Sequence, residues 1–526
     1  MRRLFAVAAL VAIVVLAGCG TTVPLQTQQY VYGGSNQSIA PTTQGDGLGS
    51  LPTATVPPTG DVTPSQPLDN TGPAPTAPSA SAASNTAAPH RGGKGSSTPS
   101  ASPTHSAVNI PTTGRGWDAH NVYIGVMTAN DFSTAAAALG AKDADPGNQE
   151  EDAQTVADLI NSQGGLFGRK VVPVYDNVST ASLLIDAAGD ASQACTHFTQ
   201  DRPVIAVYND LSPIDLPSFR SCFAQAKLPL YEGSIQSISR SALNGDLGYV
   251  TSVVSPTYSD LAPTFVARLQ AEHYFTGWNV TNGTAGSAPV KVGIIADNVP
   301  ADQEAAEALS AALARDGHPP VAQFNYTIGA SGTTSNLSSA VLQFRSRGIT
   351  HVIGADAGTG TFMVQAQSQH FYPRYGINTI NLPASSLTPD APKEELQGAL
   401  GIGWYPTLDV NGAQDPGYLS AAGKTCLAAL LKGQSYATRF AFGIGTSFCD
   451  SFGLIRAAVI AGGGFTGPQV VRGEALAGPT YTPAGSFGSN LHSGDWAIPG
   501  AGRDLGWIGK CQCFEYLSKT DYPFGS

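Results

Sequence analysis

Charged residues are scarce in this chain of 526 residues: Asp, Glu, Lys and Arg make up 12% of it, about half of the roughly 25% that is usual. Lys and Arg number 27 against 38 acidic residues, and no basic tract occurs. A surface that binds nucleic acid is therefore not expected. Long apolar runs are also missing, apart from one at the N-terminus, which excludes a protein with several membrane spans.

Catalytic motifs are missing as well. The nine His residues form no His-Glu-x-x-His pair or other metal-ligand spacing. Neither a Gly-x-Ser-x-Gly nucleophile turn nor a Gly-x-x-x-x-Gly-Lys phosphate loop occurs. An enzyme is therefore not the favoured interpretation, and no cofactor is predicted.

The N-terminal run has the form of an export signal. Arg2 and Arg3 precede 13 apolar residues at 4–16, which is shorter than the about 20 needed to span a membrane. The next residues complete Leu-Ala-Gly-Cys at 16–19, which resembles a bacterial lipobox. This motif predicts a signal peptide over 1–19, lipidation of Cys19, and anchoring at the outer face of the cell membrane.

Residues 20–116 hold 14 of the 37 Pro, mixed with Ser, Thr, Gly and Ala. Neither a helical nor a strand period is visible there. Such a composition buries too little apolar surface to offset the entropy of the chain. We expect a disordered tether between the anchor and the folded body.

Cysteines are few, and six of the seven follow the tether. An even number in an exported chain predicts disulfides. The first two lie late in successive predicted helices, and the next two lie on consecutive predicted helices. The expected pairs are Cys195–Cys222, Cys426–Cys449 and Cys511–Cys513. Zinc binding is the alternative role for the closely spaced last pair. No second pair of ligands lies nearby, so no metal site is predicted.

The body begins with alternating strands and helices. Strands are predicted at 122–127, 170–175, 204–208 and 228–231, with helices at 148–163, 180–198 and 216–226. This alternation builds a parallel sheet with helices on both faces. Pro173 lacks a backbone N–H, so its strand is expected at a sheet edge, which favours the strand order 2-1-3-4-5.

A second half of the same kind follows. Strands are predicted at 249–254, 290–296, 320–326, 351–355, 377–381 and 400–404, with helices at 258–274, 301–314, 335–347 and 361–369. Two long helices at 415–432 and 446–462 and a late strand at 507–508 complete the pattern. Two such halves indicate two lobes, with a ligand bound outside the carboxyl ends of the strands.

One turn in the first half is distinctive. Residues 158–170 read DLINSQGGLFGRK and lead to the strand end VYDN at 174–177. With the segments at 291–297, 348–354 and 451–457, the chain over about 120–465 resembles type 1 periplasmic binding proteins, within them the leucine/isoleucine/valine-binding branch. The residues at 298–301 replace a Tyr-Gly that is frequent in amino-acid binders of this family, so the resemblance does not name the solute.

The resemblance implies an α/β fold of two doubly wound parallel-sheet lobes that close over an interlobe cleft. Lobe 1 is expected at 117–254 plus about 409–480, and lobe 2 at about 255–408 plus 481–526. It implies a monomeric, lipid-anchored protein that captures a small polar solute, amino-acid-like or related, for the permease of an ABC importer. A lipid-anchored ligand sensor with the same fold is the alternative, and a secreted enzyme is a more distant one.

Polar residues that follow the predicted strands are the candidates for contact with the solute. Hydroxyl groups and backbone N–H groups suit a carboxylate, and an acidic side chain suits an ammonium. The same residue types also cap helices at these junctions, so the set is a stronger prediction than any member. The candidates are Asn130, Asp131, Ser133, Asn209, Asp210, Ser212, Glu232, Ser234, Tyr258, Asp297, Asp356 and Thr359.

Overall fold

The computed structural model describes residues 110–525 except 130, 135–143, 211–216, 247, 328–332, 412–419 and 492–494. The predicted signal peptide with Cys19, the tether up to residue 109, and the candidates Asn130 and Ser212 lie outside the described residues. The described residues all belong to one unit of the chain.

The first sheet has five parallel strands in the order β2-β1-β3-β4-β5. They are β1 (Asn121–Thr128), β2 (Lys170–Asn177), β3 (Val207–Asn209), β4 (Leu230–Glu232) and β5 (Val250–Ser252). Pro173 lies in β2, which pairs with β1 alone among the described strands. The predicted edge position and strand order are therefore confirmed.

The second sheet has eight strands, seven of them in the order β14-β13-β12-β11-β10-β8-β9, with β15 paired to β13. They are β8 (Val292–Asp297), β9 (Ala322–Tyr326), β10 (His351–Gly354), β11 (Arg374–Asn378), β12 (Leu400–Gly403), β13 (Ala501–Ile508), β14 (Cys513–Tyr516) and β15 (Tyr522–Pro523). Strands β8 to β12 run parallel, and the last three run antiparallel. All six residues of β8 are buried, as expected for a parallel strand covered on both faces.

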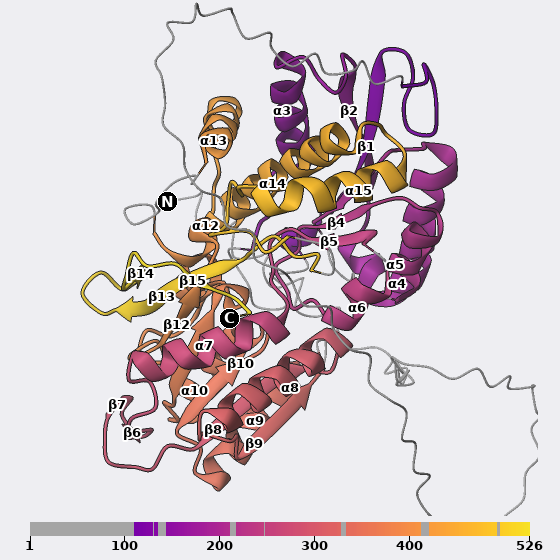
Figure 1. Cartoon of the computed structure of the whole chain (residues 1–526). Coiled ribbons are helices and arrows are strands. Elements are labelled where there is room, and N and C mark those ends of the chain that lie inside the picture. Colours follow the sequence, from indigo (N-terminus) through magenta and orange to yellow (C-terminus); the bar gives the residue numbers. More distant parts are fainter. Residues whose placement is uncertain are drawn as a thin grey trace, which may run out of the picture. The chain divides into compact units, whose positions relative to one another are not determined.

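Helices connect the strands of each sheet (Figure 1). In the first half they are α3 (Gln149–Ser162), α4 (Thr180–Thr196), α5 (Pro217–Gln225) and α6 (Arg240–Gly245). In the second half they are α7 (Tyr258–Ala271), α8 (Pro300–Arg315), α9 (Thr333–Arg347), α10 (Thr359–Ser368), α11 (Thr388–Asp390) and α12 (Pro406–Asp409). The last helices are α13 (Ala421–Gly433), α14 (Arg439–Gly462) and α15 (Gly467–Ala477), and a short hairpin pairs β6 (Trp278–Asn279) with β7 (Thr284–Ala285).

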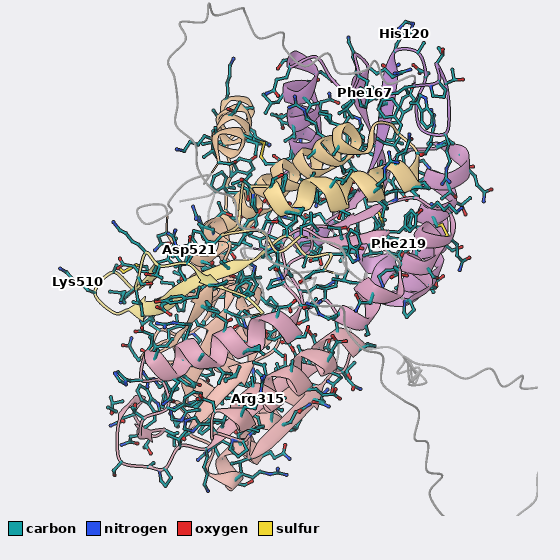
Figure 2. The ribbon with its side chains drawn as sticks, in the orientation of Figure 1. His120, Phe167, Phe219, Arg315, Lys510 and Asp521 are labelled. Carbon is teal, nitrogen blue, oxygen red and sulfur yellow. A yellow bond between two sulfur atoms is a disulfide. The ribbon has the colours of Figure 1, made fainter. Side chains whose placement is uncertain are left out.

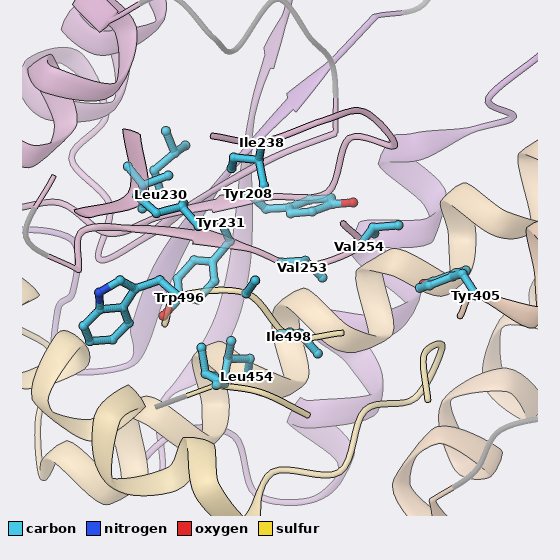
Figure 3. Packing of buried hydrophobic residues seen from close by; sticks show 14 of the residues in the cluster. Tyr208, Leu230, Tyr231, Ile238, Val253, Val254, Tyr405, Leu454, Trp496 and Ile498 are labelled. Atoms are coloured by element: carbon cyan, nitrogen blue, oxygen red, sulfur yellow. The ribbon is translucent and has the colours of Figure 1, made fainter. Parts of the chain in front are cut away.

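Three segments connect the two sheets. The first runs from β5 to α7, and the second runs from β12 through α12 to α14, which packs on α3. The third segment leads into β13. In it, Trp496 O accepts from Ser252 N of β5 at 2.7 Å, and Ile498 N donates to Ser252 O at 2.8 Å. Figure 3 shows Trp496 and Ile498 among side chains of the first sheet, including Tyr231.

Helix α14 is long and apolar enough to cross a membrane, yet 72% of its most apolar window is buried inside the protein. Its side chains pack against α3 and α15. A Cβ on Gly473 of α15 would lie 1.8 Å from the Ala458 carbonyl oxygen of α14, so the two backbones touch. Packing within the fold therefore accounts for the apolar character of this helix.

The bonded sulfur pairs are the three that the sequence favours: Cys195–Cys222, Cys426–Cys449 and Cys511–Cys513. The first joins α4 to α5, and the second joins α13 to α14. Each therefore links two helices that contact each other.

Some predicted elements differ from the structure. The strand predicted over 377–381 ends at Asn378, because the Asn378 side chain accepts the Ile380 N–H and its own N–H bonds to Asn381, which starts a 3₁₀ turn. The helix predicted at 446–462 begins at Arg439, where Thr438 caps it. The late strand is eight residues long and antiparallel, so the second sheet is mixed at that edge. The α/β fold class is confirmed.

Candidate functional site

Polar side chains follow β3 and β4 at the carboxyl edge of the first sheet. Asn209 and Glu232 are register partners on these strands, and Asn209 Nδ2 donates to Glu232 Oε2 at 3.3 Å. Both side chains are buried. The structure thus brings two predicted residues into contact at the strand ends.

Asp210, the next residue, heads a buried hydroxyl chain. Its Oδ1 lies 2.9 Å from the Tyr208 hydroxyl, which lies 2.5 Å from Ser447 Oγ on α14. Ser447 in turn donates to the Ile444 carbonyl at 2.6 Å. The other oxygen, Oδ2, accepts from Gln149 Nε2 at 3.0 Å. Figure 3 shows Tyr208 among the buried side chains of the first sheet.

Burial raises the pKa of Asp210 to about 8, against the opposing effect of the hydrogen bonds from Tyr208 and Gln149, which favours the neutral acid near pH 7. In that state, Asp210 donates to Tyr208, Tyr208 donates to Ser447, and every oxygen in the chain has a donor or an acceptor. An ionised Asp210 would reverse the Tyr208 bond and take the donor away from Ile444. The network therefore suits the neutral acid.

Asp356 holds the strand ends of the second sheet together. Its Oδ1 accepts from the Tyr326 hydroxyl at 2.6 Å and from Gly358 N at 2.7 Å, and its Oδ2 accepts from Asp297 N at 2.6 Å. Burial, followed by the charge of Asp297, raises the pKa of Asp356, and its hydrogen-bond donors oppose this rise. Asp297 and Asp356 are thus brought together, with Asp356 bonded within its own half.

Two asparagines extend this network. Asn381 Nδ2 donates to the Asp356 carbonyl at 2.7 Å and to Thr359 Oγ1 at 3.1 Å. Asn378 Nδ2 donates to the Tyr258 hydroxyl at 2.9 Å, which links β11 to the start of α7. Burial raises the pKa of Tyr258, so its hydroxyl stays protonated.

The carboxyl ends of the two sheets contact each other. After β4, the buried Ser237 Oγ donates to the Ala355 carbonyl at the end of β10 at 3.0 Å. At the next turn, Glu304 of α8 accepts from Arg240 N at 2.7 Å and from Ser241 Oγ at 2.9 Å. The segments that follow β4 and β10 at the carboxyl ends of the two sheets therefore contact each other.

Other candidates lie elsewhere or serve the backbone. Asp131 accepts from Thr180 N at 2.7 Å and from Ser179 Oγ at 2.8 Å, at the start of α4. Ser133 is exposed, and Ser234 is half-buried, with its carbonyl 3.5 Å from Ser255 Oγ. The contacts of these three thus lie at the start of α4, at the surface and at the Ser255 hydroxyl.

Six buried groups of the two networks escaped prediction: Gln149, Tyr208, Tyr326, Asn378, Asn381 and Ser447. Tyr326 and Asn378 end strands, so the strand-end rule could have found them. Gln149 and Ser447 lie inside helices, and no local pattern marks them.

One group in the described part of the chain combines three metal-ligand side chains within 4.8 Å: Cys511, Cys513 and Glu515. It lies on the β13–β14 hairpin. The strand-end acids are not part of it.

No protein-family model matches the chain, and no curated protein matches it. Solved structures do match. An ABC transporter substrate-binding protein from Desulfitobacterium hafniense, in complex with Leu, is 18% identical with a TM-score of 0.51, over 76% of this chain and 100% of that one. A solute-binding protein of an ABC transporter from R. palustris, in complex with 4-hydroxybenzoate, is 12% identical with a TM-score of 0.55, over 77% and 98%.

A fatty acid ABC transporter substrate-binding protein from Thermomonospora curvata is 12% identical with a TM-score of 0.53, over 79% of this chain and 95% of that one. These likenesses show the fold, which is the fold of ABC transporter substrate-binding proteins of the type 1 periplasmic kind.

Proposed function

We propose that the protein is an extracytoplasmic solute-binding protein that captures a small polar solute between its two halves for an ABC importer. The observation that carries the proposal is the bond from Ser237 to Ala355, which joins the segments that follow β4 and β10 at the carboxyl ends of the two sheets. In open α/β sheets, ligands bind outside the carboxyl ends of the strands. The fold shared with substrate-binding proteins supports the same conclusion.

The solute would meet carboxyl, amide and hydroxyl groups. Asn209 and Glu232 stand on one side, and Asp297, Asp356 and Thr359 stand on the other, all of them buried. Such groups recognise a solute through directed hydrogen bonds and exclude a purely apolar one. Since the similar proteins carry leucine, 4-hydroxybenzoate or fatty acids by name, the fold itself does not fix the class, and we propose an amino-acid-like or related polar solute.

The proposal includes the arrangement of the whole chain. Cys19 would be lipidated after removal of the signal, and residues 20–116 would tether the body to the outer face of the membrane. Lobe 1 would comprise 117–254 and about 409–480, and lobe 2 about 255–408 and 481–526. The three connections between the sheets would serve as hinges for closure onto a permease. The protein would act as a monomer without cofactor.

Two alternatives remain as outcomes of the experiment. A lipid-anchored sensor would bind the same solute and report it to another protein. A secreted enzyme would turn the solute over, which we do not expect because Asp210 and Asp356 are each held by hydrogen bonds of their own half.

The experiment is a thermal-shift screen of the full chain against amino acids, aromatic acids and other polar solutes. A binder gains stability as RT ln(1 + [L]/Kd), about 2.7 kcal/mol at a hundredfold excess over Kd. Glu232→Gln should weaken the shift, and Glu394→Gln, which changes an exposed carboxylate on the second half, should not. A chain that no solute stabilises would refute the proposal.

Measuring uptake of the identified solute separates the remaining interpretations. Cells without the protein should lose uptake if it serves an importer. Unchanged uptake with an altered response to the solute would favour the sensor, and consumption of the solute by the purified chain would favour the enzyme.

A further inference from the structure

The tip of the β13–β14 hairpin carries a disulfide that the fold does not need for its shape. Cys511 and Cys513 are bonded across a single residue. The strands are already paired from Leu505 opposite Tyr516 to Ile508 opposite Cys513. A bridge stabilises mainly by closing a loop, and its effect grows with loop length. This one closes almost none, whereas the other two span 27 and 23 residues.

The same bridge is the accessible one. Cys511 is exposed, and the neighbouring Lys510 lies at the outer end of the hairpin in Figure 2. Cys513 is buried, as are Cys195, Cys426 and Cys449, and Cys222 is half-buried, so Cys511 offers the one exposed sulfur residue among the six bridged cysteines. Attack on a disulfide requires access for the incoming thiolate, so thiol reagents reach the hairpin tip first.

A carboxylate stands beside both sulfur atoms. Glu515 Oε1 lies 3.7 Å from Cys511 Sγ and 3.8 Å from Cys513 Sγ. The three ligand atoms all lie within 4.8 Å of one another. Two thiolates and a carboxylate form a donor set for a borderline-soft divalent cation, and water can complete four-coordination at an exposed site.

We propose that the Cys511–Cys513 bridge is a thiol-exchangeable switch whose reduced form binds a zinc-like divalent cation together with Glu515. A dithiol reductant supplies the electrons. One of its thiolates attacks one sulfur of the bridge, which forms a mixed disulfide and releases the other cysteine as a thiolate. The second thiol of the reductant then attacks the mixed disulfide and releases the first cysteine. The reductant leaves as a disulfide, and two electrons and two protons remain on Cys511 and Cys513. Cation binding then releases both protons.

The first experiment treats the folded full chain with a dithiol reductant and maps the freed thiols by alkylation and mass spectrometry. Labelling of Cys511 and Cys513, with the other two bridges intact, is the expected result. Labelling that begins at Cys195, Cys222, Cys426 or Cys449 would overturn the proposal.

The second experiment titrates Zn²⁺ into the reduced chain after removal of the reductant. One equivalent should bind, and prior alkylation of the freed thiols should abolish binding. Glu515→Gln should weaken binding by about tenfold or more, since even outer-shell changes at metal sites cost about that much. Glu307→Gln removes an exposed carboxylate on α8 and should leave binding unchanged. Equal affinity in wild type and Glu515→Gln, or no binding, would overturn the proposal.

Discussion

The buried carboxyl group of Asp210 offers a substitution whose effect depends on pH. Asp210 Oδ1 lies 2.9 Å from the Tyr208 hydroxyl, and Oδ2 accepts from Gln149 Nε2; in the neutral state, Oδ1 would carry the proton and donate it to Tyr208. Asparagine reproduces this pattern, because its amide donates where the acid carries its proton and its carbonyl accepts where the second oxygen does. Asp210→Asn should therefore keep the network and remove only the titration.

The magnitude follows from the pKa. Burial raises the pKa of Asp210 from 3.8 to about 8 in the folded state. The contribution of such a group is fully present below the unfolded pKa and is lost as the pH rises through the folded pKa. The loss is about 1.4 kcal/mol per pH unit within that window. From about pH 5 to about pH 7, the wild type should lose about 2.7 kcal/mol of unfolding free energy relative to Asp210→Asn.

The assay is urea unfolding of the full chain at several pH values between about 5 and 8, in wild type and variant. Asp158→Asn serves as the matched control, because Asp158 is an exposed carboxylate on α3. Its pH profile should parallel that of the wild type. If Asp210→Asn also runs parallel to the wild type, or destabilises equally at every pH, then Asp210 is not the neutral head of the hydroxyl chain and the reasoning is refuted.

Three further predictions concern a buried ion pair, a contact between two helices, and the disulfides. Urea unfolding measures each of them. Arg268→Ala removes the two-bond partner of buried Asp504, at 2.7 and 2.9 Å, and should cost about 3–5 kcal/mol; an effect below about 1 kcal/mol would mean that the buried carboxylate finds other partners. Gly473→Ala places a Cβ 1.8 Å from the Ala458 carbonyl and should cost about 1–3 kcal/mol or more, whereas Gly433→Ala, which meets its nearest atom at 3.6 Å, should be tolerated. Replacing Cys426 and Cys449 by Ser opens a loop of 23 residues and should cost about 3.4 kcal/mol, against about 1.2 kcal/mol for Cys511 and Cys513, which are two residues apart; equal losses would contradict the loop-length argument.

The first sheet could be predicted closely because each of its signals is local. Pro173 placed β2 at the edge, and the glycine-rich turn at 164–168 ended α3 before that strand. The second sheet was predicted less well at its mixed edge. The strands β13 to β15 follow a long Gly- and Pro-rich stretch, and their pairing with β12 depends on a tertiary contact. Sequence periodicity does not report which distant strand an edge strand will meet.

For the site, the strand-end rule located the region, but it did not separate structural groups from groups open to a solute. Asp131 follows β1 in the same way as Asp210 follows β3, yet Asp131 caps α4, while Asp210 joins Tyr208 and Gln149. The difference arises from what packs against each acid. A local sequence pattern is the same in both cases, because Asp after a strand satisfies either environment.

The two halves also hold their strand-end acids in different states, for a reason visible in the donors around them. Asp356 accepts from a phenol hydroxyl and two backbone N–H groups, and backbone N–H groups cannot reverse direction, so these bonds favour the carboxylate. Asp210 faces a hydroxyl group, which can turn and accept a hydrogen bond from the protonated carboxyl group. Burial acts on both acids, but two backbone N–H groups hold Asp356 as an acceptor, whereas Asp210 lies against the Tyr208 hydroxyl and the Gln149 amide. A solute held between the halves would therefore meet a neutral acid at the end of β3 and a carboxylate at the end of β10. The polar and charged groups of the solute should be arranged to complement these two different acids.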